Sequence, residues 1–297
     1  MGAAAAETAP VSVVIPTIGR APLLAKCLAS LALCSPRAAE IIVVDQSGEG
    51  EIHAAVEAFA GVGARSLHCA VRDRSIAVNE GMAAAEHEFV LVTDDDCTVA
   101  ETWVETAAAH LLAEPEAIVT GRVLPVGDAI AIPSLVGAAE SSEYSGSLRY
   151  DVLFGCNMAC SRDRFLELGG FDERVQLAED NDFCYRWLRA GRRLRYDPEL
   201  LVWHHAWRTP AQLRRHFHGY ARGQGIFYAK HLLGGDLAVI RFLARDVYRA
   251  SRAAAALVLR GRGEWPDARL ALIHGVPTGF AVGWRAFRGR RDAETHG

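Results

Sequence analysis

The sequence predicts an α/β fold in which a mostly parallel sheet is covered by helices on both faces. Short apolar runs that end in turn residues alternate with stretches of helical spacing through the first hundred residues. Strands buried on both faces appear in a sequence as continuous apolar runs, which is the pattern seen here. Apolar residues make up 51% of the chain, enough for a substantial core, so global disorder is not expected.

The first half of the chain supplies the alternating elements. Strands are expected at 11–16, 41–45, 66–71 and 88–93, and helices at 21–34, 52–60 and 75–86. Ser75 is the expected N-cap of the third helix, because a serine oxygen accepts hydrogen bonds from free backbone amides. After about residue 115 the pattern changes. Strands are expected at 118–124 and 194–204, and helices from about 162 and over 179–190, around an irregular polar stretch at 128–150.

Charge divides the chain into two parts. From Ala206 onward there are 16 Lys and Arg against 6 Asp and Glu; of the chain's 32 basic and 36 acidic residues, the first 205 therefore carry 16 and 30. We predict a flexible N-terminus (1–10), an α/β domain (11–205) and a basic helical C-terminal extension (206–297). Parts of opposite charge are expected to meet different partners.

The extension contains a basic amphipathic helix, expected over about 237–259 with Asp236 as its N-cap. It carries four arginines on one stripe and apolar residues roughly opposite: Arg241, Arg245, Arg249 and Arg252. Such a helix can lie on an anionic membrane surface. Two alternatives stay open, in which the apolar face packs on the α/β domain or on a second subunit of a homodimer. No nucleic-acid partner is expected, because no recognised binding module accompanies the charge.

Cysteine usage and the N-terminus indicate a compartment. The seven cysteines include no CxxC pair, which favours a reducing environment over a disulfide framework or a zinc ribbon. The first ten residues lack the layout of a secretory signal, and no run reaches about 18 apolar residues. We therefore expect a cytoplasmic protein that can associate peripherally with the inner face of the plasma membrane.

Acidic residues follow two of the predicted strands, at the edge where ligands of parallel sheets bind. Asp45 ends IIVVD, and Asp94, Asp95 and Asp96 follow FVLVT. In an extended chain Asp94 and Asp96 would share one side. Two such oxygen ligands suit Mg²⁺ or Mn²⁺ held together with phosphates. The structural alternatives are a solvated acidic loop and, for Asp45, a carboxylate that caps the following turn.

Two further groups of polar residues lie near the end of the α/β domain. In the segment AEDND, Glu179, Asp180 and Asp182 begin a predicted helix, where the helix dipole stabilises each carboxylate by roughly 0.3–1 kcal/mol. A positioned carboxylate can equally serve as a general base. His204 and His205 close the last strand, and we expect His204 to be the nitrogen ligand of a metal and His205 to point the opposite way.

The order of these features resembles family 2 glycosyltransferases of the GT-A fold, inverting enzymes that use nucleotide sugars. VSVVIPTIGR resembles the opening strand of that family, and IIVVDQSGEG its second strand with the base-binding aspartate. FVLVTDDDCT resembles the DXD metal motif, which a tryptophan, here Trp103, follows. The block from LFGCNMACSR to LAEDND resembles the acceptor side through the ED motif, and LVWHHAW the closing histidine. The resemblance covers about 11–205.

The resemblance implies a Rossmann-like fold for nucleotide-diphospho-sugar transfer and a role for each matching position. Asp180 would be the catalytic base, with Glu179 as its supporting neighbour. The metal, Mn²⁺ or Mg²⁺, would be held by Asp94, Asp96 and His204, with Asp96 as the main ligand. The nucleotide would be bound by Pro16, Thr17, Asp45, Asn79 and Asp94. The sugar and acceptor would meet Trp103, Gly155, Asn157 and Met158.

Two positions depart from the family pattern. The family often has an Arg-Asn pair in the helix before the metal motif, whereas here Val78 precedes Asn79 and the nearest arginines, Arg72 and Arg74, are expected before the helix. The residue before the ED motif is Ala178 instead of the usual glycine.

The implied reaction is transfer of a sugar from a UDP-, GDP- or dTDP-linked donor to a hydroxyl of a glycan or lipid-linked acceptor, by one metal-assisted displacement with inversion. Two other functions are the alternatives. A sugar-nucleotide pyrophosphorylase would need a glycine- and arginine-rich loop after the first strand, and PTIGR is not such a loop. A non-catalytic nucleotide-sugar-binding subunit would have lost part of the metal and base residues, which are all present here.

Overall fold

The computed structural model describes residues 7–48, 50–129, 132, 135–146, 148–260 and 268–294. The chain forms two compact units. The first, here the sheet unit, comprises Met1–Phe171 and Phe183–Ala206. The second, the helical unit, comprises Asp172–Asp182 and Trp207–Gly297. The segment Asp172–Asp182 therefore groups with the C-terminal helices and not with the rest of the α/β region.

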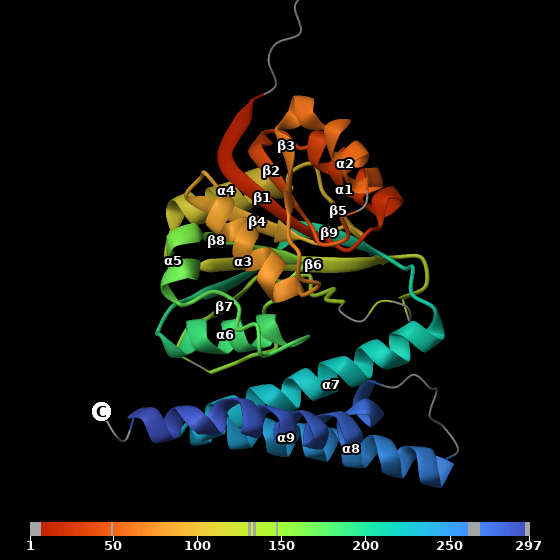
Figure 1. Ribbon diagram of the computed structural model, residues 1–297, viewed down its shortest axis with the longest axis vertical. Coiled ribbons are helices and arrows are strands. Elements are labelled where there is room, and N and C mark those ends of the chain that lie inside the picture. Colours follow the sequence, from red (N-terminus) through yellow and green to blue (C-terminus); the bar gives the residue numbers. More distant parts are fainter. Residues whose placement is uncertain are drawn as a thin grey trace, which may run out of the picture. The chain divides into compact units, whose positions relative to one another are not determined.

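The sheet unit is built on a mixed sheet, nine-stranded in the part of the chain described, with the strand order β3-β2-β1-β4-β8-β6-β9-β5 and β7 paired to β9 (Figure 1). The strands are β1 (Thr8–Thr17), β2 (Arg37–Asp45), β3 (Ala64–His68), β4 (Phe89–Thr93), β5 (Cys97–Val99), β6 (Ile118–Val126), β7 (Ser142–Tyr144), β8 (Asn157–Ser161) and β9 (Leu194–His205). Strands β1 to β4 pair in parallel, as the alternation of strands and helices predicts. Because β1 pairs in parallel with both β2 and β4, the carboxyl ends of these three strands share one edge. Strand β8 runs antiparallel to β4 and β6.

Helices cover both faces of this sheet. They are α1 (Ala21–Ala32), α2 (Gly50–Glu57), α3 (Arg74–Ala84), α4 (Trp103–Ala113), α5 (Arg162–Glu167) and α6 (Glu179–Arg189), with a short 3₁₀ turn, η1 (Ala60–Val62). Neighbouring residues of β1 enter opposite cores: Val13 packs in the same cluster as Leu28 of α1, and Val14 in the same cluster as Val78 of α3. The predicted two-layer covering of the sheet is confirmed.

The helical unit consists mainly of three long helices, α7 (Pro210–Leu233), α8 (Ile240–Arg260) and α9 (Ala268–Glu294), with a 3₁₀ turn, η3 (Leu237–Val239). Helix α7 begins with a capping box formed by Thr209 and Gln212. It runs alongside α9 (Figure 1), and a Cβ atom on Gly279 of α9 would lie 1.8 Å from the carbonyl oxygen of Arg222 on α7. The two backbones therefore touch directly. Among the described residues, every helix is too short or too polar to cross a bilayer.

Two local predictions are corrected at helix starts. Asp73, and not Ser75, caps α3: its Oδ1 accepts from the backbone amides of Ser75 at 2.8 Å and Ile76 at 3.4 Å. Arg74 is consequently the first residue of α3 instead of preceding it. Asp236 is an N-cap, as predicted, although it caps η3, which leads into α8.

Candidate functional site

The three aspartates after β4 lie in a turn. Strand β4 ends at Thr93, and the amide of Cys97 donates to the carbonyl of Asp94 at 3.0 Å before β5 begins. The prediction that Asp94 and Asp96 share one side of an extended chain is therefore wrong. In this turn each of the three carboxylates reaches a different partner.

Asp95 ties this turn to the end of β1. Its side chain is fully buried, accepts from Thr17 Oγ1 at 2.6 Å and pairs with the guanidinium of Arg20, whose Nε donates at 3.0 Å. Burial raises the pKa of Asp95 to about 6, although the charge of Arg20 opposes the shift. Sequence reasoning missed Arg20, the last residue of PTIGR, because its partner lies 75 residues away.

Asp94 pairs with Arg74 at the start of α3. Arg74 Nε and Nη2 donate to Asp94 Oδ1 at 3.0 and 2.9 Å. A Cβ atom on Gly155 would lie 3.0 Å from two nitrogens of the same guanidinium, so the absence of a side chain there makes room for the arginine. The structure thus brings Asp94 and Gly155 together through Arg74, a group whose fork of donors suits phosphate oxygens.

Asp96 and His204 form a buried pair at the far side of the turn. Strand β5 pairs with β9 so that Cys97 lies opposite His204, and the amide of His205 donates to the carbonyl of Asp96 at 2.8 Å. His204 Nε2 lies 3.3 Å from Asp96 Oδ1, and the two side chains are 5% and 2% exposed. The next residue, His205, turns the other way and contacts Thr98 Oγ1 at 3.1 Å.

The environment of His204 favours a cation. Neither ring nitrogen has a hydrogen-bond partner of normal geometry among the described residues. Burial disfavours the charged imidazolium, but Asp96 and Cys156 more than offset this effect and raise the pKa of His204 to about 10. A positive charge is stabilised here, either on the ring or on a bound ion. Carboxylate oxygen and imidazole nitrogen are suitable ligands for a divalent cation, so these residues fit the implied metal.

Two thiols adjoin the same histidine. The ligand atoms of Cys97, Cys156 and His204 all lie within 4.8 Å of one another. The contact with Cys97, and then the charge of His204, lowers the pKa of Cys156 to about 7 against the effect of burial. All seven cysteines are free thiols. The absence of a CxxC pair hid this cluster from sequence reasoning, and the pairing of β5 with β9 creates it.

The predicted nucleoside residues meet at one sheet edge. In the parallel pairing of β1 with β2, Pro16 lies opposite Val44 and Thr17 opposite Asp45. Asp45 Oδ1 accepts from the amide and the hydroxyl of Ser47, at 2.9 and 2.6 Å, which is the turn-capping arrangement left open above. Binding of a nucleoside by these residues stays a prediction.

Asn79, also predicted for the nucleotide, holds a turn of the backbone. Its Nδ2 donates to the carbonyl of Phe171 and its Oδ1 accepts from the amide of Phe171, both at 2.9 Å. A Cβ atom on Gly170 would lie 2.6 Å from Asn79 Oδ1, and Gly170 has a φ of +62°. Glycine thus permits both the turn and the close approach.

The residues predicted for the sugar and acceptor are buried, Gly155 included. Trp103, Asn157 and Met158 are all 0% exposed. Trp103 Nε1 donates to Asn157 Oδ1 at 2.9 Å, and Asn157 Nδ2 donates to the carbonyls of Leu200 at 2.8 Å and Arg122 at 3.1 Å. Their side chains hold the core together, so any contact with a sugar would use other atoms of this wall. A direct role stays a prediction.

The ED motif belongs to the helical unit, whereas Asp94, Asp96 and His204 come together in the sheet unit. Glu179 begins α6 and is buried, and Asp180 is half-buried and accepts from the amide of Asn181 at 2.8 Å. The segment before Glu179 packs directly on α7, since a Cβ atom on Gly223 of α7 would lie 2.2 Å from the carbonyl oxygen of Gln176.

A second acid of this segment, Asp182, is anchored to α7. Its carboxylate is fully buried and accepts from Lys230 Nζ at 2.8 Å, with His231 Nε2 at 2.9 Å. Lys230 also pairs with Asp172 at 2.8 Å. Burial opposes ionisation of Asp172, but Arg174 and Lys230 lower its pKa to about 2. The sequence predicts Asp180 as the catalytic base, but no sequence pattern indicates that Lys230 and His231 hold the nearby Asp182.

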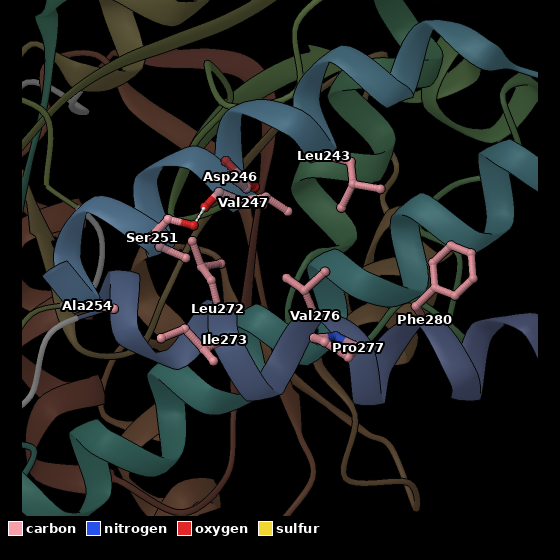
Figure 2. A pocket seen from close by; sticks show the side chains of 11 residues that line it. Leu243, Asp246, Val247, Ser251, Ala254, Leu272, Ile273, Val276, Pro277 and Phe280 are labelled. Carbon is pink, nitrogen blue, oxygen red and sulfur yellow. Dashed lines mark hydrogen bonds between the residues drawn. The ribbon is translucent and has the colours of Figure 1, made fainter.

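The helical unit also contains an apolar cavity of about 690 Å³ between α8 and α9 (Figure 2). The apolar stripe of α8 faces it with Leu243, Val247 and Ala250, and α9 faces it with Ile273 and Phe280. The described arginines of the predicted basic stripe lie elsewhere on α8, and three are exposed: Arg241, Arg249 and Arg252.

Comparison with known proteins defines the class first. The fold is that of GT-A glycosyltransferases, since solved structures of that kind superpose with TM-scores above 0.5. One is GalNAc-T7 with UDP, GalNAc and Mn²⁺, which superposes with a TM-score of 0.58 at 18% identity over 75% of this chain and 50% of that one. Another is S. aureus TarS residues 1–349, with a TM-score of 0.58 at 15% identity over 97% and 92%. A third is the mannosyltransferase PcManGT from Pyrobaculum calidifontis with GDP-Man and Mn²⁺, with a TM-score of 0.55 at 17% identity over 92% and 73%.

The sequence then gives the family. Residues 12–166, more than half of the chain, match glycosyl transferase family 2, and residues 137–201 match the N-terminal domain of galactosyltransferase. The chain belongs to glycosyl transferase family 2, a family of glycosyltransferases, as its motif order predicts.

Two relatives are similar over part of their length. The pre-mycofactocin glycosyltransferase of Mycobacterium tuberculosis is 30% identical over 210 residues, 65% of this chain and 42% of that protein. The glucosyl-dolichyl phosphate glucuronosyltransferase of Haloferax volcanii is 28% identical over 187 residues, 56% of this chain and 58% of that protein. The chain thus matches about half the length of these relatives.

Proposed function

We propose that this chain transfers a sugar from a nucleotide-diphosphate donor to an acceptor hydroxyl by a single displacement with inversion. The observation that carries the proposal is the buried pair of Asp96 and His204, next to the aspartate turn at the carboxyl edge of the sheet. Membership of family 2 supports sugar transfer. The solved structures with nucleotides and Mn²⁺ support a metal-assisted reaction.

Asp96 and His204 would hold the cation, Mn²⁺ or Mg²⁺, with Asp94 beside them. When bound, the cation would neutralise the charge that develops on the diphosphate leaving group, an effect worth several kcal/mol in a site that excludes water. Arg74, held by Asp94, would supply a second positive charge on the phosphate side. Pairing with Asp94 keeps its side chain in one orientation, so less entropy would be lost on donor binding.

The donor would lie along the carboxyl edge of β1, β2 and β4. Pro16, Thr17 and Asp45 would contact the nucleoside, and Asn79 and Asp94 would stand on its diphosphate side. Gly155 would bring backbone atoms close to the sugar. Because the side chains of the neighbouring wall are fully buried, we propose that Trp103, Asn157 and Met158 shape this wall and leave the polar contacts to the backbone.

Asp180 would accept the proton of the attacking hydroxyl, which is worth about 10²–10⁴-fold in rate. Glu179 would support it from the preceding position. The anchoring of Asp182 by Lys230 and His231 supports this role, because a general base needs a fixed backbone around it. One base on the acceptor side and no covalent intermediate give inversion.

The helical unit would bring the protein to an anionic membrane surface, where a lipid-linked acceptor would be held. The exposed arginines Arg241, Arg249 and Arg252 support this part of the proposal, as do the exposed apolar side chains Tyr248 and Trp284. We expect the intact protein to float with phosphatidylglycerol vesicles and the triple arginine-to-glutamine variant to float less. Arg72→Gln, at an exposed arginine of the sheet unit, is the matched control. Failure of the intact protein to bind these vesicles would refute membrane association.

The central test has two stages. A thermal-shift screen of UDP-, GDP- and dTDP-sugars with Mn²⁺ identifies the donor, because a ligand at 100 times its Kd stabilises the folded state by about 2.7 kcal/mol. Transfer is then measured with that donor. EDTA should abolish it, and Mn²⁺ or Mg²⁺ should restore it. Full turnover in the chelator would remove the metal from the scheme.

The base is tested separately by Asp180→Asn. We expect donor binding by isothermal titration to be nearly unchanged and transfer to fall by about 10²–10⁴-fold. Asp163→Asn, at an exposed acid of α5, is the matched control and should keep full activity. Loss of donor binding in Asp180→Asn would show that this carboxylate serves the donor and not the acceptor.

A further inference from the structure

Two thiols stand beside the proposed metal residues and have no part in the proposed reaction. Cys97 begins β5 and Cys156 directly precedes β8, and they are 1% and 5% exposed. Their sulfur atoms lie with a nitrogen of His204 inside one group, with all separations under 4.8 Å. Mn²⁺ and Mg²⁺ prefer oxygen ligands, so sugar transfer does not explain why two sulfurs are placed here.

The fourth corner of this group is an oxygen. Asp96 Oδ1 lies 3.3 Å from His204 Nε2 and 3.9 Å from Cys97 Sγ. In a tetrahedral zinc site with Zn–S of about 2.3 Å and Zn–N of about 2.0 Å, ligand atoms are roughly 3.3–3.8 Å apart. Two of the edges already have about that length, and the sulfur positions require only a small adjustment of side chains.

A second, independent observation points to a ligand. His204 is 4% exposed, yet neither of its ring nitrogens has a hydrogen-bond partner of normal geometry in the described residues. A buried polar group without such a partner destabilises the fold, and a bound cation would remove that cost. The rigid pairing of β5 with β9 keeps Cys97 opposite His204, so the arrangement does not depend on a flexible loop.

We propose that Cys97, Cys156, His204 and Asp96 form a tetrahedral site for a soft divalent cation such as Zn²⁺. On binding, each thiol gives its proton to solvent and becomes a thiolate ligand, and the His204 imidazolium also gives a proton to solvent and binds as the neutral imidazole. The Asp96 carboxylate supplies the fourth bond. Three anionic ligands and one neutral ligand around a doubly charged ion leave a single net negative charge, so the cation neutralises most of the negative charge that its ligands carry.

The site has a consequence for the reaction, and this part rests on the proposed function. Asp96 and His204 would be shared between the soft cation and the Mn²⁺ or Mg²⁺ of sugar transfer. The two ions could not be bound at once, so Zn²⁺ would act as a competitive inhibitor with respect to Mn²⁺. The thiols would make the site selective for the softer ion at equal concentration.

The direct test is cobalt binding to the full chain kept reduced with a phosphine. We expect one Co²⁺ per chain, the visible bands of a tetrahedral complex and a near-ultraviolet thiolate-to-cobalt charge-transfer band, all removed by stoichiometric Zn²⁺. Cys97→Ala and Cys156→Ala should each weaken binding by at least about 100-fold, because loss of even an outer partner of a metal ligand costs 10–100-fold. Serine variants at the same positions serve if an alanine variant does not fold.

Cys160→Ala is the matched control. Cys160 is a buried thiol of β8, but it packs in the core cluster on the other face of the sheet from Cys156, and its removal should leave the spectrum unchanged. A folded wild-type protein without the charge-transfer band would overturn the proposal, and so would a band that survives in Cys156→Ala or Cys156→Ser. The charge-transfer band reports cobalt binding and does not depend on sugar transfer. A protein that shows the band but has no transfer activity would therefore refute the proposed function and still support the zinc site.

Discussion

Replacing Asn157 with leucine tests whether this residue holds the sheet or binds the sugar. The pairing of β6 with β9 has an irregularity between Gly121 and Arg122, where the partner on β9 jumps from Asp197 to Leu201. The regular exchange of backbone hydrogen bonds is interrupted there. The Asn157 amide donates to carbonyls on both strands at this place, those of Arg122 and Leu200. It therefore replaces hydrogen bonds that the irregularity removes.

The magnitude follows from the three bonds of the side chain. Leucine has the branching and the number of side-chain heavy atoms of asparagine and is somewhat larger, so no cavity term is expected and overpacking can only add to the loss. Each lost bond removes about 1 kcal/mol net, and a buried group left without a partner costs about 1–3 kcal/mol. The indole N–H of Trp103 has only this acceptor among the described hydrogen bonds, whereas each carbonyl has a second lone pair. We therefore expect Asn157→Leu to lower the free energy of unfolding by about 3–5 kcal/mol.

The assay is urea unfolding followed by tryptophan fluorescence and far-ultraviolet circular dichroism. Thr120→Val is a graded control, because it removes one short bond, from Thr120 Oγ1 to the carbonyl of Asn157 at 2.6 Å, and one long bond, from the amide of Phe154 to Thr120 Oγ1 at 3.4 Å, and should cost about 1–2 kcal/mol. A stability of Asn157→Leu within about 1 kcal/mol of the wild type, combined with loss of donor binding, would refute this reasoning. It would assign Asn157 to the sugar, as the family resemblance implies.

Three further outcomes are expected. Arg20→Met should destabilise the protein by about 3–5 kcal/mol in chemical unfolding, since it leaves the buried Asp95 carboxylate without its cation, and a loss below 1 kcal/mol would contradict that pairing. Gly279→Ala should lower the melting temperature markedly, because the new methyl would overlap the backbone of Arg222. Gly191→Ala is the control: its new methyl would meet no atom within 4 Å, so it measures only the strain of a positive φ. The lowered pKa of Asp172 stabilises the fold above about pH 4, and this contribution, on the order of 1–2 kcal/mol, should vanish as the pH falls toward 2. The measurement is the free energy of unfolding of the wild type and of Asp172→Asn as a function of pH between 6 and 2.

Local patterns were sufficient for most elements of the sheet. Apolar runs such as VSVVIP and IIVVD form β1 and β2, whose residues are buried on both faces of the sheet. Strands buried in this way need continuous apolar sequence, and such runs can be recognised without a structure. The order of the motifs was enough for the family. Capping was less certain, since Asp73 and Ser75 are both good N-caps and only the backbone at the start of α3 decides between them.

The site itself was less predictable, because its groups meet through pairings between distant segments. Arg20 reaches Asp95 across 75 residues, and Cys97 meets His204 only through the register of β5 on β9. No local spacing reports such a register. In the turn that begins at Asp94, three adjacent carboxylates reach three separate partners. Two of these partners, Arg20 and Arg74, could not be identified from the acidic motif alone.

The anchoring of Asp182 limits how this protein can be trimmed. A version ending at residue 206 would retain every strand, yet it would take away Lys230 and His231, which neutralise that enclosed acid. The AEDND stretch would then lose its support while the sheet still appeared intact by spectroscopy. Inactivity of such a shortened protein would say nothing about membranes or acceptors, and fusion or deletion experiments should therefore keep residues 172–182 together with the last ninety.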